Sequence, residues 1–453
     1  MRLIAIVAGL SLSVAPAVPA SPGLDWGECS SPATGVSCAT LTLPVDWDDP
    51  RQGTFGLAVA KREARVPAER VGTLVFGPGG PGDSGVSRVL TGSSRFSAEI
   101  LDRFDIVGFD PRTVGHSAAP DCEPDAGRPP VILRSQDEFD AAIAANRAYW
   151  QRCRESSALF DHADSVSAAR DLDALRRALG EERLTFHGSS YGTLLGEMYA
   201  ERYPGHVRAI VLESVFDHDL PLTDFVRTEA AGLQDSFDEF VSWCDSTDCL
   251  GEDADVPAIW ADVLARAETG EYAPNTVFEI ATLPLGYLSS PSWTGLADQI
   301  AALRRGEVPD PPDLSVAEGI LCADFPAPVR DYRDYRRLLD AARSVAPDVR
   351  YGAGMLAVAT CLGWPRPLAN PPHRLRVSTA TPLLLLNAVH DPRTPYAWAT
   401  HVAAELGPGG RLVTYAGWGH GSYRETSCTI AAVDRYLVDL TVPPPGTTCP
   451  AAE

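Results

Sequence analysis

The sequence predicts an α/β protein with a mostly parallel central sheet, helices on both faces and a mainly helical insertion. Short apolar runs that end in turn residues alternate with helix-like stretches, and this alternation is typical of a parallel sheet. The alternation stops between about residues 216 and 375, where helix-like segments and proline-rich turns follow one another. A chain of 453 residues, 45% hydrophobic and 22% charged, is long enough for one large core with such an insertion.

Six apolar runs are expected to be buried strands whose C-terminal ends bring polar residues to one edge of the sheet. They are "VGTLVFGPGG" (71–80), "FDIVGFDPR" (104–112), "RLTFHGSS" (183–190), "RAIVLES" (208–214), "TPLLLLNAVHD" (381–391) and "RLVTYAGWGH" (411–420). Helices are expected over 164–180, which starts with a capping residue and ends at glycine, and over 191–203, which stops before Pro204.

The chain is expected to divide into four segments. Residues 1–20, "MRLIAIVAGLSLSVAPAVPA", are typical of a secretory signal that is cut after about Ala20. A first core segment then covers 21–215, a helical cap covers 216–375, and a second core segment covers 376–453. An open α/β sheet binds its ligand at the C-terminal edge of the strands, which is where the insertion is expected to lie.

Composition excludes several classes of partner. With 38 basic against 60 acidic residues and a net charge of −22, the chain lacks the clustered cations that bind phosphate. Neither nucleic acid nor an anionic membrane is therefore expected as a partner. No segment after the signal has the roughly 18 unbroken apolar residues that a membrane helix needs, so we expect a secreted, soluble protein. The oligomeric state is not predicted.

The ten cysteines suit an oxidising compartment. A zinc site is the alternative, but "CDSTDC" is not CxxC and has no second pair at zinc-finger spacing, so no metal and no cofactor are expected. The simplest pairing joins neighbours along the chain: Cys29 with Cys38, Cys122 with Cys153, Cys244 with Cys249, Cys322 with Cys361, and Cys428 with Cys449.

The motif "GSSYG" (188–192) fits Gly-x-Ser-x-Gly, with Ser190 in the nucleophile position and Ser189 in the variable slot. Small-residue turns are common, so the motif alone is weak, but a strand before it and a helix after it strengthen the prediction. The helix that begins at Tyr191 points its N–H groups and the positive end of its dipole at the reaction centre.

A serine nucleophile needs a histidine base and a carboxylate that orients the base. In the order serine, acid, histidine, the base follows the last strand, where "GWGHG" places His420 on a glycine-rich loop. Asp391, at the end of the penultimate strand, is the predicted acid, and Asp217 and Asp219 are the alternatives. The alternative interpretation of His420, a histidine on a surface loop, suits His162, His206 and His373 better. His390 is not expected to take part, because adjacent residues of a strand point to opposite faces and Asp391 is its neighbour.

The tetrahedral intermediate needs two N–H donors, for which Tyr191 and the segment "FGPGGPGDSG" (76–85) are the candidates. A plain turn and a phosphate-binding loop are the alternatives for that segment. It lacks the Gly-Lys-Ser/Thr ending of a P-loop and the spacing of a dinucleotide fingerprint, which disfavours nucleotide binding.

Five motifs, taken together in their order along the chain, carry a resemblance to a known family. They are "GPGGPGDSG", "FDPRTVGHS", "GSSYGT", "HDPRTP" and "GHG" with a trailing cysteine pair. They resemble the secreted actinobacterial branch of the proline-iminopeptidase-related α/β-hydrolases, of the tripeptidyl-aminopeptidase type. The resemblance spans nearly the whole mature chain and implies an α/β-hydrolase fold with a mainly helical cap and a TAP-like C-terminal region.

By this resemblance, Ser190 is the nucleophile, Asp391 the acid and His420 the base, and Gly80 and Tyr191 donate to the oxyanion. Carboxylates near the substrate's free amine are also implied.

Two departures from the family pattern stand out. Thr113 replaces a usual glycine, which is expected to alter a loop, and Glu213–Ser214 replaces a usual acidic-Gly pair at the crevice. An α-ammonium is best held by a partly desolvated carboxylate, for which Glu213 and Asp324 are the candidates. A structural ion pair or a solvated side chain is the alternative for either.

Three functions are compatible with these motifs. The first is a secreted serine aminopeptidase that cleaves short peptides from free N-termini through an acyl-enzyme. The second is an esterase or lipase that uses the same three residues on small esters, because a fold alone does not fix a function. The third is a binding protein of hydrolase fold without catalytic activity.

Overall fold

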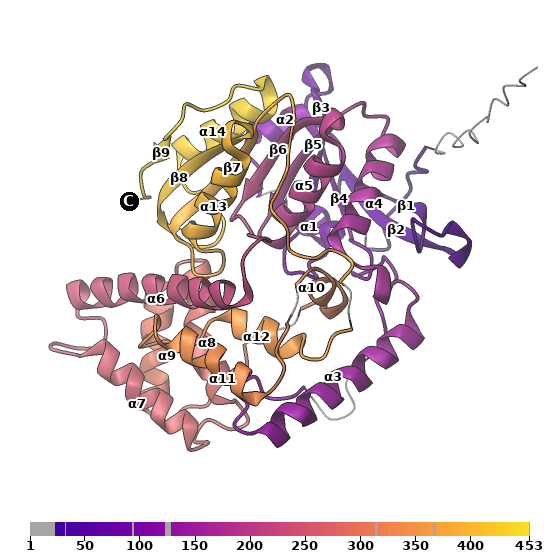
Figure 1. The fold of residues 1–453 in the computed structure, drawn as a ribbon. Coiled ribbons are helices and arrows are strands. Elements are labelled where there is room, and N and C mark those ends of the chain that lie inside the picture. Colours follow the sequence, from indigo (N-terminus) through magenta and orange to yellow (C-terminus); the bar gives the residue numbers. More distant parts are fainter. Residues whose placement is uncertain are drawn as a thin grey trace, which may run out of the picture.

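The computed structural model describes residues 23–31, 33–92, 95–122, 128–312, 316–325, 327–365 and 368–452. The signal sequence expected over residues 1–20 lies outside the described residues. A nine-stranded sheet forms the centre of the described chain (Figure 1), with strand order β1-β2-β4-β3-β5-β6-β7-β8-β9. The strands are β1 Val36–Pro44, β2 Thr54–Arg62, β3 Gly72–Gly77, β4 Phe104–Phe109, β5 Leu184–Ser189, β6 Val207–Glu213, β7 Leu383–His390, β8 Gly410–Trp418 and β9 Thr448–Cys449.

The mostly parallel sheet is confirmed, and each of the six expected strands is present as β3 to β8. The neighbouring strands in the part of the sheet ordered β4-β3-β5-β6-β7-β8-β9 are all parallel. By contrast, β2 runs antiparallel to both β1 and β4. The strands β1, β2 and the two-residue β9 were not predicted. In β1 and β2, buried residues largely alternate with partly exposed or exposed ones, whereas the six expected strands were recognised by apolar runs typical of a strand buried on both faces.

Helices cover both faces of the sheet and fill the interval before β7. They are α1 Gly85–Thr91, α2 Ala98–Arg103, α3 Gln136–Ser156, α4 Ser165–Ala178, α5 Tyr191–Arg202, α6 Leu222–Thr247, α7 Val256–Glu268, α8 Val277–Ser289, α9 Trp293–Arg304, α10 Glu318–Asp324, α11 Tyr332–Arg343, α12 Ala353–Thr360, α13 Tyr396–Leu406 and α14 Ser427–Asp439. The expected helices over 164–180 and 191–203 appear as α4 and α5. Asp164 caps α4 by accepting from the Ser167 N–H at 2.8 Å.

The run of leucines in β7 shows how the two faces are built. Leu383 and Leu385 pack into the cluster that α4, α5 and α13 form with one face. Leu384 and Leu386 pack on the other face, with residues of α1, α2 and α14. Alternate residues of a strand point to opposite faces, so a fully apolar strand is what a sheet covered on both sides requires.

The helices α6 to α9, α11 and α12 share a separate apolar core beside the sheet, with Trp260 and Phe237 among its fully buried residues. In Figure 1 they form a layer along one edge of the sheet, and α6 runs along the boundary between this layer and the strands. The helix α3, from the chain before β5, packs against the same core through Phe139 and Ala142. We call α6 to α12 together with α3 the helical layer.

Five disulfides are formed, and they are the five neighbour pairs that the order of cysteines predicts. Every cysteine of the chain is paired. None of the described helices combines the length and the apolar character that crossing a membrane demands.

The segment after β4 is fixed by a buried ion pair. The guanidinium of Arg112 donates to both carboxylate oxygens of Asp171 on α4, at 2.7 and 2.6 Å, and both side chains are buried. Thr113, which stands where the resembled family has glycine, lies in the following turn at φ 70°. As expected, this departure concerns a loop, and Thr113 tolerates a left-handed conformation that usually favours glycine.

Candidate active site

Ser190 lies on the sharp turn between β5 and α5. Its backbone has φ 56° and ψ −126°, a conformation outside the regions that serine prefers. The Ser190 N–H donates to the Glu213 carbonyl at 2.9 Å, and the Ser190 carbonyl accepts from the Thr193 hydroxyl at 2.7 Å. The fold thus holds this serine in a strained turn at the start of a helix, as the Gly-x-Ser-x-Gly pattern predicts.

The two glycines of the motif are required by close packing. A Cβ on Gly188 would lie 2.4 Å from the Gly192 carbonyl oxygen. A Cβ on Gly192 would lie 2.3 Å from the carbonyl oxygen of Gly77, at the end of β3. Any side chain at either position would collide with backbone, so glycine is what allows the turn to pack against the neighbouring strand.

The structure brings Asp391 and His420 together. His420 Nδ1 lies 3.0 and 3.1 Å from the two carboxylate oxygens of Asp391, which is buried at the end of β7. Asp391 also accepts from the N–H groups of Arg393 and Thr394. Burial alone would raise the pKa of Asp391, but the charge and hydrogen bond of His420 and these N–H groups outweigh it and hold the pKa below its usual value.

The loop that carries His420 is anchored from β6. Glu213 Oε1 accepts from the N–H groups of Ser422 and Tyr423 at 2.8 and 2.7 Å, and the Ser214 hydroxyl accepts from the Gly421 N–H at 2.9 Å. Both residues of the unusual Glu-Ser pair therefore hold the histidine loop in place.

A second anchor of the same loop comes from the helical layer. The His420 N–H donates to the Ser289 carbonyl of α8 at 2.7 Å. The Trp418 indole donates to Glu239 of α6 at 2.9 Å and packs edge-on against Trp293 of α9. The histidine position thus depends on the helical layer as well as on the sheet.

The predicted oxyanion donors lie close to Ser190. The N–H of Tyr191 is the first of α5 and has no acceptor within the helix. Among the described residues, the Gly80 N–H has no acceptor either. Gly79, beside it, approaches so closely that a Cβ there would lie 3.0 Å from Ser190 Cβ. The arrangement leaves two N–H groups beside the serine with unused donor capacity.

Ser190, Gly80, Tyr191 and His420 line one cavity of about 540 Å³. Aromatic side chains of the cavity wall include Phe216, Phe225 and Trp398. This volume falls in the range of small-molecule and short-peptide sites.

The cavity also contains a carboxylate that the sequence analysis missed. Glu229 of α6 is 2% exposed and accepts from the N–H groups of Ala353 and Gly354, at 2.8 and 2.9 Å. Burial raises the pKa of Glu229 to about 7, against the lowering effect of these N–H groups and of Arg393. Arg393 also lines the cavity and donates to the Ser289 hydroxyl. Arg393 belongs to the motif "HDPRTP", whereas Glu229 stands neither at a strand end nor in a motif, so no signal in one sequence marks Glu229.

The structure places the two predicted amine-binding residues outside the cavity that contains Ser190. Glu213 pairs with Arg95 at 2.8 Å in addition to holding the histidine loop. Asp324 is fully buried behind Tyr191, whose hydroxyl donates to it at 2.6 Å, and it also accepts from Ser165. Burial raises the pKa of Asp324 to about 7. Their engagement of an ammonium group stays a prediction.

The alternative acids lie away from His420. Asp217 accepts from His401 Nδ1 at 2.6 Å, and Asp219 faces His401 and Glu405. Among the candidates weighed, Asp391 alone contacts the imidazole of His420.

A central parallel sheet with a serine on a strained strand-to-helix turn and a histidine–aspartate pair beside it defines an α/β-hydrolase, and this chain belongs to that family. The family model described as alpha/beta hydrolase fold matches residues 72–250, and the model described as TAP-like protein matches residues 348–449. The family is one of serine hydrolases and peptidases.

The chain is similar over nearly its whole length to three curated proteins. It is 31% identical to serine protease Hip1 of Mycobacterium tuberculosis, over 94% of this chain and 91% of that one. It is 32% identical to carboxylesterase B of the same organism, over 95% and 90%. It is 29% identical to the tripeptidyl aminopeptidase of Streptomyces lividans, over 94% and 86%.

Proposed function

We propose that this protein is a serine aminopeptidase that removes short N-terminal peptides through an acyl-enzyme. The observation that carries the proposal is the cavity in which Ser190 and His420 share a wall with the buried carboxylate of Glu229. A free α-ammonium group is the natural partner of a carboxylate in such a site. The similarity to a tripeptidyl aminopeptidase and to a serine protease supports the same reading.

In the proposed mechanism, Ser190 Oγ attacks the carbonyl carbon of the scissile peptide bond while His420 Nε2 takes its proton. Asp391 holds the imidazole in the tautomer that leaves Nε2 free and stabilises the imidazolium. The N–H groups of Gly80 and Tyr191 donate to the oxyanion. The C–N bond then breaks, the leaving amine takes the proton from His420, and water hydrolyses the ester with His420 again as base.

The helical layer would limit which substrates fit. We propose that residues 216–375 act as a cap, because α6 carries Glu229 and Phe225 into the cavity that contains Ser190. A substrate would place its amino terminus against Glu229 and its scissile carbonyl against Ser190. The space between them then decides how many residues are released.

Secretion is part of the proposal. A signal that is cleaved near Ala20 would deliver the chain to an oxidising compartment, where its five disulfides are stable. Amino-terminal sequencing of the protein from culture medium tests the cleavage position. A mature chain that begins well beyond residue 21, or retention of residues 1–20, would contradict it.

Ester hydrolysis is the second candidate, favoured by the aromatic part of the cavity wall and by the similarity to a carboxylesterase. Peptide anilides with free and with acetylated N-termini, assayed beside short acyl esters, separate the two functions. Cleavage that depends on a free amine supports the aminopeptidase, and activity on esters alone refutes it. Stoichiometric labelling by a fluorophosphonate that is lost in Ser190→Ala excludes a binding protein without catalysis.

A further inference from the structure

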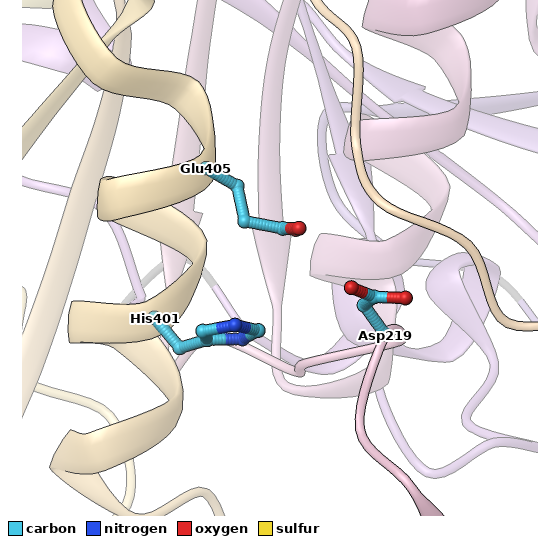
Figure 2. Close-up of side chains that lie close together, drawn as sticks. All are labelled: Asp219, His401 and Glu405. Carbon is cyan, nitrogen blue, oxygen red and sulfur yellow. The ribbon is translucent and has the colours of Figure 1, made fainter.

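Outside the candidate active site, α13 and the loop after β6 bring together three side chains that could bind a metal ion. His401 and Glu405 lie one helical turn apart on α13, and Asp219 approaches them from the loop after β6 (Figure 2). One ligand atom from each of the three lies within 4.8 Å of those of the other two. Residues four apart on a helix share a face, which is why His401 and Glu405 meet.

The imidazole of His401 is held in one orientation by a buried acid. Its Nδ1 lies 2.6 Å from Asp217 Oδ2, and Asp217 is fully buried. When Nδ1–H donates to this carboxylate, Nε2 keeps its lone pair. A carboxylate behind the distal nitrogen of a histidine is the usual support of a metal ligand, because it fixes the tautomer and raises the basicity of the ligating nitrogen.

A buried acid with an unpartnered oxygen lies near the same cluster. Glu197 of α5 is 1% exposed, and among the described residues its Oε1 has no hydrogen-bond partner. The negative charges that act on it are those of Asp217, Glu405 and Glu201, in that order, so it lies near this cluster. Glu405 lies 3.8 Å from Arg374 Nε and accepts from the Leu375 N–H at 3.3 Å. Burial, with these negative charges, raises the pKa of Glu197 well above its usual value, and a cation bound nearby would stabilise its charged form.

We propose that Asp219, His401 and Glu405 bind a divalent cation of the zinc type. One imidazole and two carboxylates are ligands that Zn²⁺ accepts, and the imidazole disfavours Mg²⁺ and Ca²⁺, which prefer oxygen alone. Tetrahedral coordination at about 2.0–2.2 Å fits ligand atoms that lie within 4.8 Å of one another. Water completes the coordination.

The position of the site gives the cation a structural role. Asp219 belongs to the loop that leaves β6 and enters α6, and α6 carries Glu229 into the substrate cavity. A cation shared with α13 fastens this loop to the core. Its binding is expected to raise the melting temperature and to leave the chemistry at Ser190 intact.

The test uses the mature protein after treatment with EDTA. Zn²⁺ is titrated in by calorimetry, with Mg²⁺ and Ca²⁺ in parallel, and the melting temperature is measured with and without one equivalent. The expected result is one Zn²⁺ per chain and a higher melting temperature. Asp217→Asn is expected to weaken binding by about 10- to 100-fold, because it removes the support of His401 while leaving the ligands.

Matched variants locate the site. His401→Ala and Glu405→Gln should each abolish the stoichiometric heat and the thermal shift. His206→Ala, at an exposed histidine elsewhere, should retain both. His420→Ala should also retain both, which separates this site from the histidine of the candidate active site. If circular dichroism shows that His401→Ala folds poorly, the result for Glu405→Gln alone determines whether Zn²⁺ binds at this site. No Zn²⁺ uptake by the native chain, or uptake that His401→Ala and Glu405→Gln leave unchanged, overturns the proposal.

Discussion

Replacement of Glu229 by glutamine tests how the substrate's amino terminus is held. The change keeps the size of the side chain but removes the buried negative charge. Loss of one partner from a buried, hydrogen-bonded charge pair costs about 2–5 kcal/mol. A mid-range cost of about 3 kcal/mol corresponds to a roughly hundredfold loss of kcat/KM, at 1.36 kcal/mol for each factor of ten. That loss should fall on substrates with a free amine and spare their acetylated counterparts.

The pH dependence sharpens the same prediction. The pKa of Glu229 is raised to about 7, so the carboxylate ionises and becomes able to pair with an ammonium group as the pH rises through 7. The preference for free over acetylated N-termini should therefore increase from pH 6 to about 7.5, and should decline as the substrate amine, with a pKa of about 7.7–8.0, loses its proton. The ratio of the two rates cancels any pH effect on the chemical step that both substrates share.

The assay measures kcat/KM for matched free and acetylated tripeptide anilides across this pH range. Asp245→Asn is the matched control, since Asp245 is an exposed acid on the same helix. In Glu229→Gln the preference for a free amine should vanish together with its rise around pH 7. Equal losses on both substrates, with the preference intact, would refute the role of Glu229 as the ammonium partner.

Three further changes have defined outcomes. Asp391→Asn should lower kcat about 10⁴-fold without unfolding the protein, because the imidazole loses the partner that sets its tautomer; a loss below tenfold on the preferred substrate contradicts its role. Arg112→Ala should cost about 3–5 kcal/mol of unfolding free energy in urea, since it leaves Asp171 buried without its partner; a cost under 1 kcal/mol shows that water replaces the guanidinium. Replacing Cys322 and Cys361 by serine should cost about 4 kcal/mol, from the entropy of a loop with a sequence separation of 39; unchanged denaturation midpoints argue against this estimate.

The site residues that could be predicted from the sequence lie at or just after the ends of strands. Ser190 and Asp391 directly follow buried strands, and His420 lies two residues beyond one, so local apolar runs were enough to bring them to one edge of the sheet. The disulfide partners could also be predicted, because each pair closes a short interval of chain.

Residues that meet through the packing of the helical layer could not be predicted. Glu229 lies in the middle of a long amphipathic helix, where its neighbours in sequence resemble those of any solvated acid. Its environment is set by α12, more than a hundred positions later in the chain. Glu213 is a different case: its place at a strand end led to the prediction of substrate contact, and its carboxylate also accepts from the N–H groups of Ser422 and Tyr423, which no strand pattern indicates.

The hydrogen bond from the His420 amide to Ser289 has a consequence for how the enzyme is built and altered. A helix of the outer layer supplies part of the frame that orients the imidazole, so the layer is no independent module. Deleting the helical layer, or exchanging it for the helical layer of a relative, would remove part of the cavity wall and also the hydrogen bond that holds the loop after β8. Changes of specificity are therefore better sought at single positions on the cavity wall than by grafting whole helices.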